Sequence, residues 1–223
     1  MSDIVLSSIK RIHKALRGEI AKLNAEALEL TNDPPAISAF AGHYEMATNI
    51  LHGHAHGEDT VVFPALEAKL PGIVTTYNLD HRAEEKLTGE IKQTIAGIQN
   101  GDGHPALRVL YGQIAALAFH LTRHMDTEEA HFYPLMDETL TDDEKLALFR
   151  GVYTEIPAEA FAQGMPWFAG WWTPEEMAEE VSSYKRLMPQ EKVEQIMAPL
   201  AKSVSPDYWA ALAKAHPELS RYS

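Results

Sequence analysis

The sequence contains no cysteine among its 223 residues. This absence excludes disulfide bonds, thiolate metal sites, iron–sulfur clusters and every redox mechanism based on a thiol. A metal ion bound by this chain must therefore be held by nitrogen and oxygen atoms.

Positive charge is also scarce, because 19 lysines and arginines face 32 aspartates and glutamates and leave a formal net charge of −13. Nucleic-acid phosphates and anionic membrane surfaces attract clusters of positive charge. We therefore expect neither nucleic acid nor a membrane as a partner. No apolar run approaches the roughly 20 residues of a membrane span, and residues 1–10 lack the pattern of a signal peptide. A cytoplasmic location is the expectation.

Helical periodicity dominates the chain, which is 45% hydrophobic and long enough to bury a sizeable core. Apolar positions recur at helical spacing and are interrupted where Pro and Gly cluster. This pattern predicts long helices at about 2–30, 36–69, 75–99 and 105–138. Their short connections predict antiparallel neighbours. The expected fold is all-α, an antiparallel up-down four-helix bundle over residues 1–140.

Residues 141–223 are predicted as a helical C-terminal extension of four short helices packed on the bundle. Thr141-Asp-Asp-Glu144 and Thr173-Pro-Glu-Glu176 are typical helix starts, with a polar cap followed by acids. Three of the four tryptophans lie in the segment Pro166–Trp172. This apolar segment either fastens the extension to the bundle or offers a docking surface to a protein partner.

One motif occurs twice with identical offsets: a histidine, a glutamate four residues later, and an aromatic-Pro pair five residues after that. The copies are His54, Glu58 and Phe63-Pro64, and His124, Glu128 and Tyr133-Pro134. Helical residues four apart lie one turn apart on nearly the same face, so each copy aims an imidazole and a carboxylate in one direction. Each proline should kink or end its helix just beyond that pair.

A solitary histidine precedes each copy, His13 by 41 residues and His81 by 43, which indicates a duplicated helical hairpin. Burying four imidazoles and two carboxylates in one bundle without a cation would be strongly unfavourable. Imidazole with carboxylate suits iron, manganese or zinc, and two carboxylates can bridge two ions. The candidate metal ligands are His13, His54, Glu58, His81, His124 and Glu128.

Three histidines near the first copy are excluded as ligands by helical geometry. At about 100° per residue, His52 and His56 point away from His54 and toward solvent. His43 shares the face of His54 but lies about 16 Å away along the helix axis.

Near the second copy, His120 and His131 share the face of the ligand pair, where supporting contacts are favoured over ligation. Glu85 follows the solitary histidine of the third helix by four residues, and is either a ligand, a supporting group or a solvated glutamate. Asp59 and Glu129 each follow a motif glutamate directly. They point about 100° off the site and are assigned to the surface or to a helix contact.

The order of these motifs over an antiparallel bundle resembles the hemerythrin-like (HHE cation-binding) family across about residues 5–140, with the bacterial members as the nearer match. The resemblance implies two non-haem iron ions joined by an oxo or hydroxo bridge. It also implies bridging by Glu58 and Glu128 and terminal ligation by His13, His54, His81 and His124. Invertebrate oxygen carriers of this family have HxxxH on the third helix, whereas this chain has His81 and Glu85 there. Reversible oxygen carriage is therefore not implied.

Ferritin-like proteins, by contrast, pair a glutamate with a histidine three residues later, whereas here the histidine leads and the gap is four. Three functions follow as hypotheses. The favoured one is binding or sensing of oxygen, peroxide or nitric oxide through an open iron position. The others are an enzyme that disproportionates peroxide or reduces nitric oxide, and a protein that handles iron or donates it for repair. A bundle without metal is the remaining alternative.

Overall fold

The computed structural model describes residues 2–101 and 103–222, and all regular structure within them is helical. Contacts divide the chain into two compact units. The central unit is Leu16–Met136, and the terminal unit comprises the residues up to Ala15 together with those from Asp137 onward. The all-α fold class is confirmed, while the expected domain boundary near residue 140 stays a prediction.

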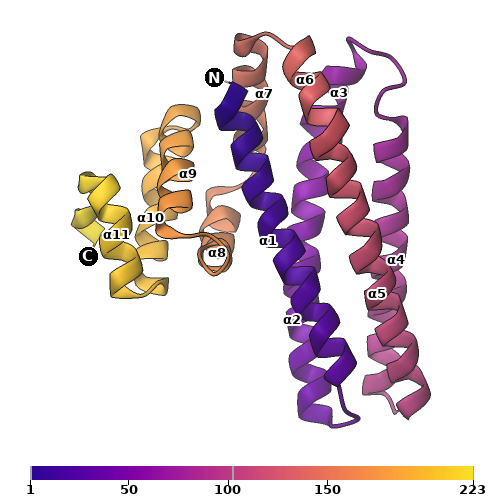
Figure 1. Cartoon of the computed structure of the whole chain (residues 1–223). Helices are drawn as coiled ribbons and strands as arrows, with labels where there is room; N and C mark the ends of the chain where they lie inside the picture. Colours follow the sequence, from indigo (N-terminus) through magenta and orange to yellow (C-terminus); the bar gives the residue numbers. More distant parts are fainter. Residues whose placement is uncertain (1, 102, 223) are drawn as a thin grey trace. The chain divides into compact units, whose positions relative to one another are not determined.

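The four predicted long helices are present as α1 (Ser2–Glu29), α2 (Pro34–Gly57), α4 (Thr75–Gln99) and α5 (Gly103–Thr127) (Figure 1). Their ends follow from local chemistry. Asp33 caps α2 by accepting a hydrogen bond from the N–H of Ala36, and Gly101, with a φ of 106°, turns the chain after α4. None of the helices in the described part of the chain is both long and apolar enough to cross a membrane.

A π-helical turn interrupts each copy of the repeated motif. The turn η1 (Glu58–Val62) joins α2 to α3 (Phe63–Glu67), and η2 (Glu128–Phe132) joins α5 to α6 (Tyr133–Thr139). In both copies the N–H of the aromatic residue donates to the carbonyl of the motif glutamate five residues earlier. The proline is then the second residue of the next helix, where its missing N–H is tolerated. The interruption expected beside each proline is present, and π turns are frequent at functional sites.

The central unit is held by apolar packing between neighbouring helices. The helix α4 packs along α5, and α2 packs against α4 (Figure 1). Ile91 on α4 and Ile114 on α5 are fully buried. The hydroxyl of Tyr44 on α2 donates to the carbonyl of Thr88 on α4 at 2.8 Å. This buried polar contact fixes how α2 and α4 align, because leaving either group without a partner would be costly.

The terminal unit contains more helices than the sequence predicts. The expectation of four short helices is wrong, because the described residues form five α-helices and a 3₁₀ helix: α7 (Asp142–Glu155), α8 (Ala158–Ala169), α9 (Pro174–Leu187), α10 (Gln190–Ser203), α11 (Pro206–Ala215) and η3 (Pro217–Tyr222). A proline precedes or begins each of these helices from α8 onward, and proline both ends the preceding helix and suits the first turn of the next. The helix starts at Thr141 and Thr173 are confirmed as capping boxes.

The first part of α1 belongs to the terminal unit and is held there by α9. Glu180, which is 1% exposed, accepts hydrogen bonds from Ser8 at 2.6 Å and Arg11 at 2.8 Å, and also from Tyr153. The indole N–H of buried Trp172 donates to the carbonyl of Arg11 at 2.8 Å. The tryptophan segment thus fastens the first part of α1 to the C-terminal helices, while the packing of these helices on a bundle stays a prediction.

Candidate metal centre

Two groups of side chains in the central unit could hold metal ions. In the first, Glu58, His81, His124 and Glu128 are all buried and offer ligand atoms within 4.8 Å of one another. In the second, the same two glutamates lie equally close to His54. The glutamates are therefore common to both groups, which is the arrangement that two bridging carboxylates require.

The two motif glutamates occupy equivalent positions in the two copies. The histidine lies in the last turn of the long helix, and the glutamate is the first residue of the π turn. The Nε2 of His54 lies 3.6 Å from Oε1 of Glu58, and the Nε2 of His124 lies 3.2 Å from Oε1 of Glu128. The one-turn spacing predicted from the sequence thus places each imidazole against its own carboxylate.

His81 on α4 and His124 on α5 face each other with their Nε2 atoms 3.1 Å apart, and the Nε2 of His81 also lies 3.4 Å from Oε2 of Glu58 in the first copy. The Nδ1 of His81 lies 2.7 Å from a carboxylate oxygen of Asp59. When Nδ1 donates its proton to Asp59, the Nε2 of His81 carries a lone pair. Two such lone pairs at 3.1 Å would repel unless a proton or a metal ion lies between the rings. The donor set therefore fits a cation.

Electrostatics in the centre also favour positive charge. Burial alone would lower the pKa of His81, but hydrogen bonding and charge from Glu58 and Asp59 outweigh it and raise that pKa to about 9. Burial raises the pKa of Glu84 to about 7, although the imidazoles of His124 and His81 oppose the shift. Without a metal, the centre would hold protons in place of the missing positive charge.

Aromatic rings enclose the centre. Phe63 stacks on His81 with ring centroids 5.2 Å apart, and Phe132 lies edge-on to both Phe63 and Tyr77. The hydroxyl of Tyr133 donates a hydrogen bond to Oε1 of Glu58. Because apolar rings surround ionisable groups that are costly to bury without counter-charge, the residues present fit a buried cation.

His13 is fully buried on α1 and belongs to the terminal unit, three residues before the central unit begins at Leu16. Its role as a ligand stays a proposal.

The histidines excluded from the site have other surroundings. His52 and His56 are exposed, as their helical phase predicts. His43 lies between two carboxylates of α1, with Nδ1 2.5 Å from Glu26 and Nε2 in contact with Glu19. These contacts link α1 to α2 within the central unit and use both ring nitrogens of His43.

Around the second copy, the structure changes the expectation for His131 and agrees with the interpretation of Glu85 as a solvated glutamate. His131 is exposed although a regular α-helix would put it on the ligand face, because the π turn of η2 rotates the residues that follow Glu128. Glu85 is exposed, and its neighbour Glu84 is buried instead, with Oε1 3.2 Å from Nδ1 of His120. His120 thus contacts Glu84, and its supporting role at the metal centre stays a prediction.

Sequence reasoning missed the acid that orients His81. Asp59 was assigned to the surface or a helix contact, and its side chain is indeed 41% exposed, but its carboxylate reaches His81 on the neighbouring helix. The corresponding Glu129 instead pairs with Arg17 of α1 at 2.7 Å. The only signal in the sequence was the acid directly after each motif glutamate, and it does not distinguish these two roles.

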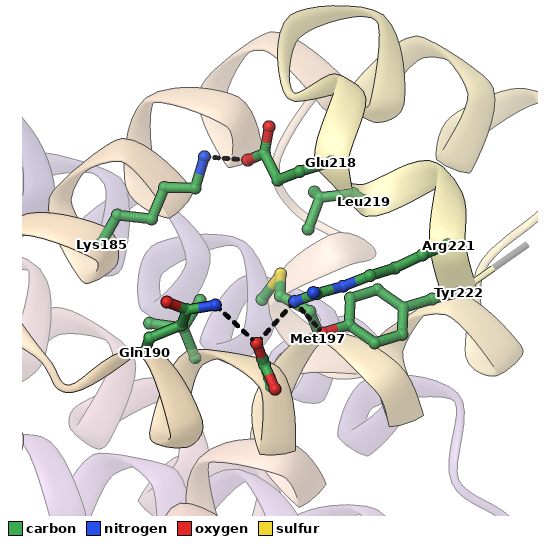
Figure 2. Close-up of a pocket in the computed structure, with 9 residues that line it drawn as sticks. Lys185, Gln190, Met197, Glu218, Leu219, Arg221 and Tyr222 are labelled. Carbon is green, nitrogen blue, oxygen red and sulfur yellow. Dashed lines mark hydrogen bonds and ion pairs between the residues drawn. The ribbon is translucent and has the colours of Figure 1, made fainter.

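A separate pocket of about 310 Å³ lies in the terminal unit, among α9, α10 and η3 (Figure 2). Its charged groups pair with one another: Lys185 with Glu218, and Arg221 with Glu194 at 2.7 Å. These pairs balance the charge of the pocket, and its lining includes no histidine. It does not have the donor set of the centre in the central unit.

Comparison with known proteins shows that the part of the chain that contains the candidate metal ligands is similar to a cation-binding domain. The hemerythrin HHE cation binding domain model matches residues 5–136. Zinc finger protein BRUTUS of Arabidopsis thaliana is 26% identical over 182 residues, which are 81% of this chain and 14% of that protein. Two BRUTUS-like zinc finger proteins of the same plant are 25% and 24% identical, each over 86% of this chain and 16% of its own length. No solved structure matches.

The extent of these matches has two consequences. The chain spans about a sixth of the length of the curated relatives it matches. Because the matched share of this chain is larger than the part that ends at residue 136, the similarity also reaches the helices of the terminal unit.

Proposed function

Because the chain belongs to the hemerythrin HHE cation-binding domain family, we propose that its central unit holds two non-haem iron ions joined by an oxo or hydroxo bridge. The observation that carries this proposal is the sharing of Glu58 and Glu128 by both ligand groups. Imidazole and carboxylate are suitable donors for iron, and two carboxylates offset the charge of two ions. The proposed ligands are His13, His54, Glu58, His81, His124 and Glu128.

His13 is the one proposed ligand outside the central unit. The assignment is supported by the complete burial of its imidazole on α1. The helix α1, which carries His13, continues into the central unit up to Glu29. The assignment requires α1, α2, α4 and α5 to form the antiparallel up-down bundle that the sequence predicts, and we propose this arrangement.

We further propose that the centre binds or senses oxygen, peroxide or nitric oxide. Bound iron would supply an open coordination position for such a ligand. The residues of the chain restrict which molecules can reach it. Glu128 is 0% and His124 3% exposed. Phe63 packs on His81 and Tyr77 on His124, and Phe132 packs against both of these aromatic rings. These surroundings support a ligand of two or a few atoms.

A di-iron enzyme and an iron-handling protein are the alternative functions. One experiment tests the proposal and distinguishes it from both alternatives. The purified protein is analysed for metal content, and its near-ultraviolet and visible spectrum is recorded before and after reduction and after exposure to oxygen, peroxide and nitric oxide. Two irons per chain and a spectrum that responds to one of these molecules are expected. Sustained turnover would instead indicate the enzyme, and ready loss of iron to a weak chelator would indicate iron handling. Absence of iron, or zinc that responds to none of them, would contradict the proposal.

A further inference from the structure

The aromatic residue of the repeated motif differs between the copies by one hydroxyl group. The first copy has Phe63 and the second has Tyr133, each five residues after the motif glutamate and each 1% exposed. The two rings make different contacts. Phe63 stacks on His81 with an interplanar angle of 17°, whereas Tyr133 donates its hydroxyl to Glu58, the glutamate of the other copy.

The hydrogen bond from Tyr133 selects one oxygen of Glu58. It reaches Oε1, and this is the oxygen that lies 3.6 Å from Nε2 of His54. The other oxygen, Oε2, lies 3.4 Å from Nε2 of His81. The carboxylate of Glu58 is therefore turned so that one oxygen faces each of the two ligand groups.

We infer that Tyr133 is a positioning residue that makes Glu58 a bridge between the two metal positions. A carboxylate at the end of a free side chain can rotate, and it can then offer both oxygens to one ion and none to the other. A donor fixed on Oε1 removes this freedom and holds the bridging orientation before any metal binds. The inference rests on the proposed di-iron function and goes beyond it, because it assigns the binding of the second ion to a residue that is not a ligand.

The two metal positions should respond differently when this hydrogen bond is lost. At the position of His81 and His124, His81 is oriented by Asp59, and the oxygen of Glu58 that lies near His81 is Oε2 rather than the Oε1 to which Tyr133 donates. The position at His54 depends on Oε1 of Glu58, which Tyr133 holds. In Tyr133→Phe the first ion should therefore bind as in the wild type, and the second should bind about 10–100-fold more weakly.

The test is an anaerobic titration of the metal-free full-length chain with Fe²⁺ in competition with a chelator, for the wild type and Tyr133→Phe. Tyr44→Phe is the matched control, since it removes another buried tyrosine hydroxyl of the central unit, one that donates to the carbonyl of Thr88 on α4 and not to a proposed ligand. Its two binding steps should equal those of the wild type. Circular dichroism and thermal unfolding of the metal-free proteins report on folding independently of metal.

Two outcomes would overturn the inference. One is binding of both ions by Tyr133→Phe with wild-type affinity. The other is equal weakening of both steps together with a lower unfolding temperature of the metal-free protein, which would mean that Tyr133 only packs. If the wild type itself binds fewer than two ions, the proposed di-iron function fails. If the wild type binds two ions and Tyr133→Phe does so equally well, the inference about Tyr133 alone fails.

Discussion

His81 on α4 and His124 on α5 point their Nε2 atoms at each other across 3.1 Å. Each Nδ1 atom faces an aspartate, Asp59 at 2.7 Å and Asp80 at 3.6 Å. The Nδ1 atoms of both rings thus face aspartates, while their Nε2 atoms face the two motif glutamates, His81 at 3.4 Å from Glu58 and His124 at 3.2 Å from Glu128.

Removing one ligand should remove metal and destabilise the central unit. In Glu58→Ala or His124→Ala, the remaining buried ionisable groups lose their counter-charge. Metal analysis should show less than one ion per chain. A metal ion present at about 1,000 times its Kd contributes about 4 kcal/mol to the free energy of unfolding. Loss of the metal should therefore lower the thermal midpoint by about 10 °C. Full metal content and an unchanged midpoint in both variants would show that the site is wrongly placed.

The matched control for these variants is His56→Ala. His56 lies two residues from His54 and is exposed, so its removal should leave metal content and thermal midpoint unchanged. A large loss of metal in His56→Ala would mean that the face of α2 that carries the ligands is wrongly assigned.

Asp59→Asn should weaken metal binding although Asp59 is not a proposed ligand. The carboxylate of Asp59 orients His81 and increases the donor strength of its Nε2, and loss of such a contact typically costs about 10–100-fold in metal affinity. Chelator competition measures the effect. The control is Glu129→Gln, at the corresponding position of the second copy, where the carboxylate pairs with Arg17. Equal affinities of Asp59→Asn and Glu129→Gln would contradict this role.

The metal-free protein should lose stability as pH rises above neutrality. The pKa of His81 is raised to about 9 in the folded chain, above its ordinary value of 6.5. The protonated form therefore stabilises the fold fully below pH 6.5, and this contribution disappears as pH rises through 9. The contribution is on the order of 2 kcal/mol. Urea unfolding of chelator-treated wild type and His81→Gln should show a stability difference at pH 6 that shrinks by pH 9.5. A difference independent of pH would argue against a protonated His81.

Breaking the ion pair between Arg11 and Glu180 should destabilise the terminal unit. Both side chains are buried, and removal of Glu180 leaves Arg11 with the exposed Glu179 as its remaining counter-charge and takes an acceptor from Ser8 and Tyr153, which costs about 3 kcal/mol. Chemical unfolding of Glu180→Ala measures this loss. Lys14→Ala is the control, because Lys14 pairs with Glu176 on the same two helices but is about half exposed, and it should cost less than about 1 kcal/mol. Similar losses in both variants would contradict the prediction.

The features that the sequence determined by itself are local ones. The bounds of α4 follow from helical periodicity and from the glycine-rich turn after Gln99, and the capping boxes follow from threonine and glutamate three residues apart. The pairing of each motif histidine with its glutamate requires only one turn of helix. Such features depend on neighbours within about four residues, so the pattern of residues is sufficient to predict them.

Where a π turn changes the helical phase, the spacing of residues no longer predicts which side chains face the site. A regular α-helix predicts His131 on the ligand face, but the π turn beside Pro134 rotates it to the surface. Likewise Glu84 and Glu85 flank the same helical face of α4, and their order in the sequence does not say which one is buried. The packing of α5 decides it, because His120 approaches Glu84.

Contacts between distant residues were decided by the tertiary structure alone. Tyr133 and Glu58 are 75 residues apart in the sequence, and Asp59 and His81 are 22 apart. Neither pair has a periodic signal, since each contact arises only after α2, α4 and α5 have packed side by side. The sequence therefore determined which groups could bind a metal, while packing decided which groups orient them, because orientation depends on neighbours that the chain brings together only by folding.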